Sequence, residues 1–250
     1  MVQGASPGRV AFASPLRHGC LGVQAAFGRT TVSNPGLYVN VLDLEAFDAK
    51  PLTRDPFDFV IVDNFIRPTM FKDVMADFPR IPGPGSHPPA ELSIKGRFKA
   101  LLDELEGQAF RSAVERKFDL DLSGRPTMYT VRGFVAERDG RIHTDSKTKI
   151  ITVLLYLNEG WEADGGRLRL LRSGEALDNP VAEVSPNEGT LLVFRRSDVS
   201  WHGHKTFKGQ RRAIQMNWVT GADVVASEQR RHAFATRIKK LKNMFLPMTG

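Results

Sequence analysis

The second half of the chain carries a series of short β-like runs, and this series constrains the fold more than any other feature. After Gly124-Arg125-Pro126, apolar and β-branched runs alternate with turn residues such as Asp139-Gly140 and Gly165-Gly166. The series predicts strands at 127–136, 149–157, 167–172, 181–184, 190–195, 201–206 and 211–219. Many short strands in succession predict an antiparallel β-sandwich or barrel.

The first half of the chain shows helical periodicity instead. The apolar run at 57–66 predicts one strand, and Pro68 suits the first turn of the helix that follows it. A second helical stretch is expected at 98–118, after a Pro/Gly-rich loop at 82–96. Residues 227–246 predict a C-terminal helix that begins at Ser227. Helices first and strands later indicate an α+β fold.

The domain organisation follows from composition. Residues 1–36 are rich in Gly, Ala, Ser and Pro and predict a disordered leader, and 37–250 are expected to form one domain with its β core at about 125–220. The only cysteine, Cys20, excludes an intrachain disulfide, so we expect a reducing, cytoplasmic location. No apolar stretch is long enough to predict a membrane span.

The triplet His143-Thr144-Asp145 is the main candidate for chemistry, together with His202 further along the chain. Alternate residues of an extended segment share a face, so His143 and Asp145 can reach one metal ion. Two imidazoles and one carboxylate are the ligands of mononuclear non-haem Fe(II) sites, which leave positions open for a co-substrate and O₂. Alone, the triplet is equally compatible with a loop histidine hydrogen-bonded to an aspartate.

Arg211 opens the last predicted strand. The period of two places it on a polar face with Ala213, Gln215 and Asn217. A guanidinium there can bind a carboxylate with two hydrogen bonds, although a surface arginine is the alternative. Tyr156 shares a face with Thr152, so its hydroxyl can reach the same carboxylate or, alternatively, the solvent.

Taken in order, these motifs resemble the 2-oxoglutarate/Fe(II) oxygenases of the prolyl-4-hydroxylase type. The resemblance covers roughly 125–220 and is carried by His143-x-Asp145, Tyr156-Leu157-Asn158, Gly165-Gly166, His202 and Arg211-x-Ala213-Ile214. It implies a double-stranded β-helix, or jelly roll, with N-terminal support helices and a C-terminal helix. It also implies Fe(II), 2-oxoglutarate as co-substrate, and ascorbate as a further candidate cofactor.

The resemblance assigns roles to individual residues. His143, Asp145 and His202 would ligate iron, and Arg211 would bind the distal carboxylate of 2-oxoglutarate with help from Tyr156. The nine-residue offset from His202 to Arg211 favours His202 over His204 as the distal ligand. Asn217 stands where the prolyl-hydroxylase branch often has a bulky aromatic residue, so a prolyl substrate is not implied.

The resemblance predicts hydroxylation, with O₂ consumed and succinate and CO₂ released, and the basic charge balance favours a polar or anionic small molecule, or a peptide, as the substrate. The entrance candidates are the 82–96 loop, Arg132, Trp161, Arg167 and Arg169. One alternative is a non-catalytic, cupin-like metal-binding or sensor module. Another is an oxygenase acting on a nucleic-acid or ribosomal target, since the net charge is +7. The basic residues are scattered and lack interleaved aromatics, so we interpret them as a solvated surface.

Overall fold

The structure, a computed structural model, describes residues 40–227. The predicted leader, Cys20 and nearly all of the predicted C-terminal helix lie outside the described residues; residues 222–227 are helical. Among the described residues, no helix is long and apolar enough to cross a membrane.

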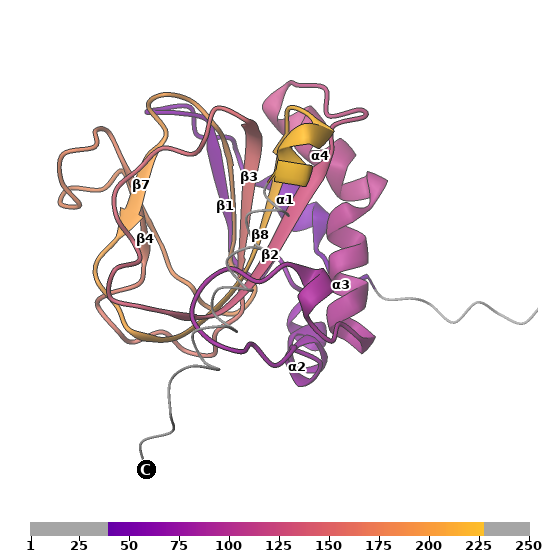
Figure 1. The fold of residues 1–250 in the computed structure, drawn as a ribbon. Coiled ribbons are helices and arrows are strands. Elements are labelled where there is room, and N and C mark those ends of the chain that lie inside the picture. Colours follow the sequence, from indigo (N-terminus) through magenta and orange to yellow (C-terminus); the bar gives the residue numbers. More distant parts are fainter. Residues whose placement is uncertain (1–39, 228–250) are drawn as a thin grey trace, which may run out of the picture. The chain divides into compact units, whose positions relative to one another are not determined.

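Within residues 40–227, eight strands form two antiparallel sheets. They are β1 (Phe59–Val62), β2 (Thr127–Val135), β3 (Lys149–Tyr156), β4 (Leu168–Leu171), β5 (Ala182–Val184), β6 (Leu191–Arg195), β7 (Trp201–His204) and β8 (Gly209–Val219). The larger sheet has the order β1-β6-β3-β8-β2, and the smaller has the order β5-β4-β7. Figure 1 shows several of these strands, with β4 and β7 set apart from the larger sheet. The predicted jelly roll is therefore confirmed, and every strand expected after residue 126 is present.

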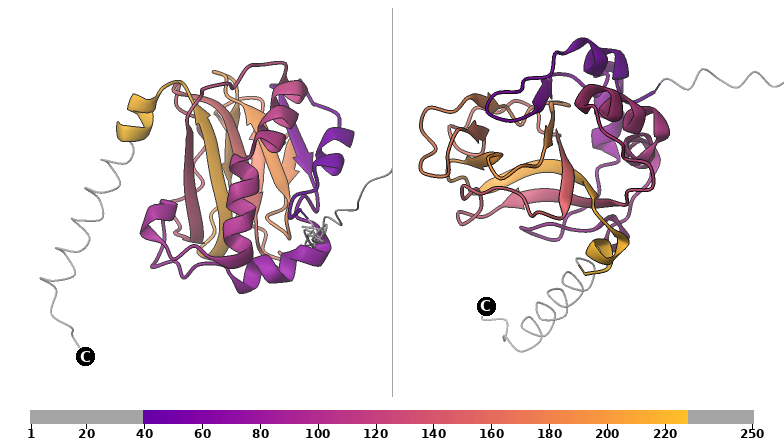
Figure 2. Two further views of the ribbon diagram at one scale, coloured as in Figure 1. Left: turned by 90° about the vertical axis from the view of Figure 1, so that its right-hand side faces the viewer. Right: turned by 90° about the horizontal axis from the view of Figure 1, so that it is seen from above.

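Helices cover one face of the larger sheet, while β4 and β7 lie on its other side (Figures 1 and 2). The helices are α1 (Leu44–Ala49), α2 (Pro68–Ala76), η1 (Pro89–Glu91), α3 (Gly96–Glu106) and α4 (Gln108–Phe118). The prediction of one helical stretch at 98–118 was wrong, because Gly107 is extended and separates α3 from α4. Glycine disfavours a helix interior by about 1 kcal/mol, and the break lets each helix bury its own apolar side.

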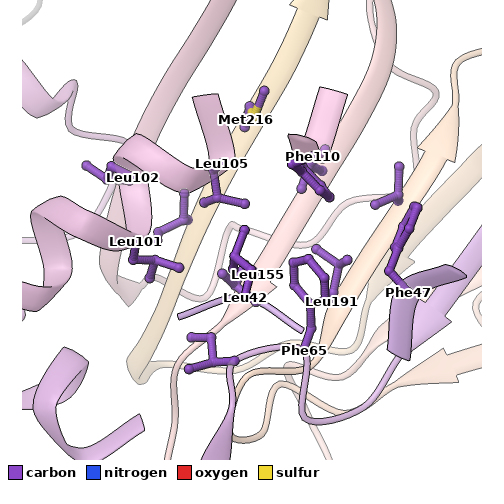
Figure 3. Packing of buried hydrophobic residues seen from close by; sticks show 14 of the residues in the cluster. Leu42, Phe47, Phe65, Leu101, Leu102, Leu105, Phe110, Leu155, Leu191 and Met216 are labelled. Atoms are coloured by element: carbon purple, nitrogen blue, oxygen red, sulfur yellow. The ribbon is translucent and has the colours of Figure 1, made fainter. Parts of the chain in front are cut away.

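The outer core lies between these helices and the larger sheet. Strand alternation supplies Leu155, Leu191 and Met216 from the sheet, and α3 and α4 supply Leu105 and Phe110 (Figure 3). All five are fully buried. Burying one such side chain stabilises the fold by roughly 1.5–3 kcal/mol. This core holds the larger sheet as a rigid base for the side chains on its other face.

The inner face of the larger sheet points toward β4 and β5. Tyr156, Leu192, Phe194 and Ala213 pack there against residues of the smaller sheet. Residues that alternate with the outer core on β3 and β8 thus enter the space between the sheets. The polar members of that inner face form the site described below.

The Pro/Gly-rich segment at 82–96 borders the edge strand β2. His87 exchanges two backbone hydrogen bonds with Val131, of 2.8 and 3.0 Å. The segment is thereby attached to β2 at one point, and the strand edge on either side of that point borders a pocket.

Candidate metal centre

A backbone bridge places His143 beside His202. Each residue donates its N–H to the carbonyl oxygen of the other, both at 3.0 Å, and the two imidazole rings lie 4.4 Å apart between centroids. On the far side, Arg196 Nε donates to the carbonyl oxygen of Asp145 at 3.1 Å. These main-chain contacts hold a loop and the end of a strand, about sixty residues apart in sequence, in one fixed register.

Both imidazoles have the tautomer that a metal requires. Nδ1 of His143 lies 2.8 Å from the carbonyl oxygen of Arg141, and Nδ1 of His202 lies 2.9 Å from that of Ser200. A carbonyl only accepts, so each Nδ1 carries the proton and each neutral ring keeps its Nε2 lone pair free. A backbone acceptor of this kind is the usual orienting partner of a metal-binding histidine.

Asp145 supplies a buried carboxylate to the same place. Its Oδ1 accepts from Lys149 Nζ at 2.7 Å, and its Oδ2 accepts from Thr152 Oγ1 at 2.5 Å. Asn217 Nδ2 donates in turn to the Thr152 hydroxyl at 2.8 Å. Burial raises the pKa of Asp145, but the charges of Lys149 and His202 and the hydrogen bonds from Lys149 and Thr152 together outweigh it, so the pKa is lowered overall. The carboxylate is thus ionised and held in one orientation.

The three side chains converge on one point. One ligand atom from each of His143, Asp145 and His202 lies within 4.8 Å of the others, with Asp145 and His202 buried and His143 exposed. Two neutral imidazoles and one carboxylate can hold a divalent first-row metal ion such as Fe(II), with one side left open. The three residues therefore fit an Fe(II) ion, because they offer two nitrogen donors and one oxygen donor, carry one negative charge and leave one side of the ion open.

His204 is not part of this cluster. Its Nδ1 lies 2.8 Å from the carbonyl oxygen of Lys205, and burial lowers its pKa, with Arg211 acting in the same direction. The structure therefore separates the two histidines of β7. His202 lies with His143 and Asp145, whereas the charge of Arg211 acts on His204.

Arg211 lies buried on the inner face of β8 with no ion-pair partner among residues 40–227. Its Nε donates to the carbonyl oxygen of Gly166 at 2.7 Å, and its Nη2 lies 3.3 Å from the Tyr156 hydroxyl. The guanidinium also lies 4.9 Å from the centre of the Tyr156 ring. An unpaired buried charge is costly, so this guanidinium and this hydroxyl form a ready site for a carboxylate.

The turn Gly165-Gly166 has a local steric reason. A side chain at Gly165 would collide with the carbonyl oxygen of Thr206, and Gly166 has φ +80°, with Trp161 only 2.7 Å from where a Cβ would lie. Only glycine fits this left-handed position without strain. The turn thus presents the Gly166 carbonyl to Arg211.

Three supporting residues were not predicted as part of the site: Lys149, Arg196 and Asn158. Lys149 and Arg196 hold Asp145, and Asn158 holds the backbone of Arg212 by accepting from its N–H at 2.6 Å and donating to its carbonyl at 3.1 Å. Asn158 did occur in the motif Tyr156-Leu157-Asn158, so that signal was present in the sequence. Nothing in the sequence pattern links Lys149 or Arg196 to Asp145. Trp161, Arg167 and Arg169, which were expected near the entrance, donate hydrogen bonds to backbone carbonyls, and Arg169 also pairs with Glu183.

Acid is expected to destabilise the metal-free protein. Burial lowers the pKa of His202 from 6.5 to about 4, despite the opposing charge of Asp145. Between those pH values the unfolded chain binds a proton at His202 that the folded protein does not, so the free energy of unfolding falls as pH falls from 6.5 to about 4. The loss is on the order of 3 kcal/mol. Urea unfolding at a series of pH values measures it, and His202→Gln should flatten the profile; an unchanged slope in this variant would contradict the assignment.

Comparison with known proteins gives one sequence family. Residues 128–220 match the 2OG-Fe(II) oxygenase superfamily, and this span contains the three clustered residues, Tyr156 and Arg211. No curated protein sequence matches the chain.

Several solved structures are similar at low identity. A prolyl-4-hydroxylase from Pseudomonas putida is 19% identical over 70% of this chain and 90% of that chain, with a TM-score of 0.42. A prolyl hydroxylase from Trichoplax adhaerens, in complex with a hypoxia inducible factor oxygen degradation domain peptide fragment, is 18% identical over 72% and 88%, with a TM-score of 0.42. An oxidoreductase of the 2OG-Fe(II) oxygenase family from Burkholderia pseudomallei is 12% identical over 70% and 89%, with a TM-score of 0.44.

Proposed function

We propose that the chain is a 2OG-Fe(II) oxygenase, in keeping with the match of residues 128–220 to that superfamily, and that it hydroxylates a small-molecule or peptidyl substrate with release of succinate and CO₂. The single observation that carries this proposal is the convergence of His143, Asp145 and His202 within 4.8 Å. Fe(II) and 2-oxoglutarate are the cofactors of the superfamily.

We propose that Nε2 of His143, Nε2 of His202 and one carboxylate oxygen of Asp145 hold the iron. The hydrogen bonds at both Nδ1 atoms support this, because they leave Nε2 as the free donor in each neutral ring. The lowered pKa of Asp145 supports it as well, since a ligating carboxylate must be ionised. Lys149 and Thr152 keep that carboxylate from rotating away.

Arg211 and Tyr156 are proposed to hold the distal carboxylate of 2-oxoglutarate. A carboxylate there would compensate a guanidinium that has no acidic partner among residues 40–227, and the Tyr156 hydroxyl would donate a further hydrogen bond. Burial raises the pKa of Tyr156, so its hydroxyl keeps its proton and remains a donor. The Gly166 carbonyl fixes the other side of the guanidinium.

When bound, the metal and 2-oxoglutarate would supply the oxidation, in which 2-oxoglutarate gives CO₂ and succinate and the two atoms of O₂ end in succinate and in the hydroxylated substrate. The side chains of this chain supply geometry and a dry wall. The ring centroids of Phe194 and His202 lie 5.0 Å apart, and Leu192 and Tyr156 are fully buried in the same apolar cluster as Phe194. The inner side of the site therefore excludes water.

The proposal predicts that the purified chain, loaded with Fe(II) in the presence of O₂, converts 2-oxoglutarate to an equal amount of succinate. Chromatography of both acids measures this, and omission of Fe(II) is the matched control. Calorimetric titration of 2-oxoglutarate into the protein loaded with Mn(II), which is redox-inert under these conditions, separates binding from turnover. A chain that binds neither metal nor 2-oxoglutarate would not be an oxygenase of this kind.

A further inference from the structure

A pocket of about 630 Å³ adjoins the candidate metal centre at the β2 edge of the larger sheet. Its walls include Lys149 and Asn217, which contact Asp145 directly and through Thr152 respectively. The 82–96 segment contributes Ser86 and residues 88–90. The volume suits a small molecule, and the wall places that molecule next to the carboxylate of the candidate metal centre.

Arg132 is a half-buried arginine in this pocket. It faces the inner side of β2, opposite Ala213, whose short side chain leaves room beside it. The described residues give Arg132 neither a hydrogen bond nor an ion pair, and its Nε is buried without a partner. Burial lowers its pKa, as does the charge of Arg211, while Asp139 attracts it from further away. A guanidinium in this position is stabilised only when an anion joins it.

The charge balance shows that the expected cofactors do not supply this anion. Three cations, Arg132, Arg211 and Lys149, outnumber two carboxylates: Asp145, which pairs with Lys149, and Asp139, which attracts Arg132 without forming an ion pair with it. Fe(II) and the doubly charged 2-oxoglutarate carry equal and opposite charges, so loading both leaves the positive excess unchanged. Under the proposed function Arg211 takes the one distal carboxylate that 2-oxoglutarate offers.

The remaining walls do not supply it either. Thr130, Gln215 and Asn217 are neutral, and Glu106 is the carboxylate among the described lining residues. Glu106 is exposed and forms no ion pair with Arg132 among the described residues. No described wall residue therefore neutralises Arg132.

We infer that the substrate of this site is a small molecule bearing an oxyanion, a carboxylate or a phosphate, and that Arg132 binds this group in the pocket beside Asp145. The inference rests on the proposed function, because it takes 2-oxoglutarate to be held by Arg211. A planar guanidinium with all its donors free can bind either oxyanion with two parallel hydrogen bonds. Arg132 then orients the substrate by its oxyanion. The rest of the substrate extends along the neutral polar walls toward Lys149 and Asn217.

The test observes the Arg132 side chain directly. The full chain is ¹⁵N-labelled, loaded with Zn(II) as a diamagnetic, redox-inert substitute, and saturated with 2-oxoglutarate. The Nε–H signal of Arg132 is identified by its loss in Arg132→Lys. Acetate and inorganic phosphate are then titrated in separate experiments at constant ionic strength. We expect a saturable shift of this signal in the wild type, and calorimetric titration of the same anions should give about 10- to 100-fold weaker binding in Arg132→Gln.

Each outcome decides the inference. A shift with acetate alone, with phosphate alone or with both supports it and identifies the source of the oxyanion. No shift with either anion overturns it. It is also overturned if 2-oxoglutarate itself shifts the signal and Arg132→Gln weakens 2-oxoglutarate binding at least tenfold, because Arg132 would then serve the co-substrate.

A matched control and a prior measurement complete the test. Arg172→Gln removes an exposed arginine that pairs with Asp55 outside the pocket, and it should leave anion binding unchanged. Binding of 2-oxoglutarate is measured first. Its absence would count against the proposed function, while the anion titration still reads Arg132 in the same protein.

Discussion

Asp145→Ala is expected to abolish Fe(II)-dependent turnover of 2-oxoglutarate and to weaken metal binding by more than about 100-fold. Loss of a residue that merely supports a ligand costs 10- to 100-fold in metal affinity, so loss of a ligand should exceed this range. The substitution removes the one carboxylate of the cluster and also leaves the Lys149 ammonium without its partner at 2.7 Å. That unpaired cation would repel the metal. Anaerobic titration with Fe(II) or Co(II), followed by succinate analysis, measures both effects.

Two variants make this result specific. Asp103→Ala removes an exposed aspartate that pairs with Lys99 on α3, and it should behave as the wild type. Thr152→Val keeps the ligand but removes the hydrogen bond of 2.5 Å to Asp145, so an intermediate loss of 10- to 100-fold is expected. Wild-type metal affinity in Asp145→Ala would exclude Asp145 as a ligand.

Much of the fold could be predicted because alternation and turn residues are local signals. The faces predicted for β8 match the structure: Ile214, Met216 and Trp218 enter the outer core, and Ala213 enters the inner one. The helical half was harder. Apolar spacing continues across Gly107, so periodicity alone did not reveal the break between α3 and α4. α1 was not predicted at all; it is only six residues long and buries Phe47 alone.

The site divides in the same way. The two-residue spacing of His143 and Asp145 is local, and the sequence carried it. The bridge between His143 and His202 depends on long-range pairing that no single-sequence pattern contains. The register of β3 shifts between Lys149 and Ile151, and the register of β2 shifts between Arg132 and Phe134. Strand alternation therefore does not determine where the side chains of Lys149 and Arg132 point. Residues at such irregularities had to be located in three dimensions.

Arg211→Met is expected to raise the dissociation constant of 2-oxoglutarate by about 100-fold or more. Truncating one partner of a buried, hydrogen-bonded charge pair costs roughly 2–5 kcal/mol, and each 1.4 kcal/mol is a factor of ten. Tyr156→Phe removes one neutral hydrogen-bond donor and should cost only about fivefold. Calorimetry with 2-oxoglutarate and the Mn(II)-loaded protein measures both constants.

The next residue of β8, Arg212, supplies the control, because it is also an arginine but points to the opposite face of the strand. The Arg212 guanidinium lies 5.5 Å from the centre of the Phe78 ring, on the helix side of the sheet, so Arg212→Met should bind 2-oxoglutarate as the wild type does. Stability separates a binding role from a structural one. Arg211 is a buried charge without an acidic partner among residues 40–227, so its removal should cost the metal-free protein only about 2 kcal/mol, the value of its hydrogen bonds to the Gly166 carbonyl and the Tyr156 hydroxyl. If Arg211→Met instead unfolds the chain and its folded fraction binds 2-oxoglutarate normally, Arg211 serves the fold rather than the co-substrate.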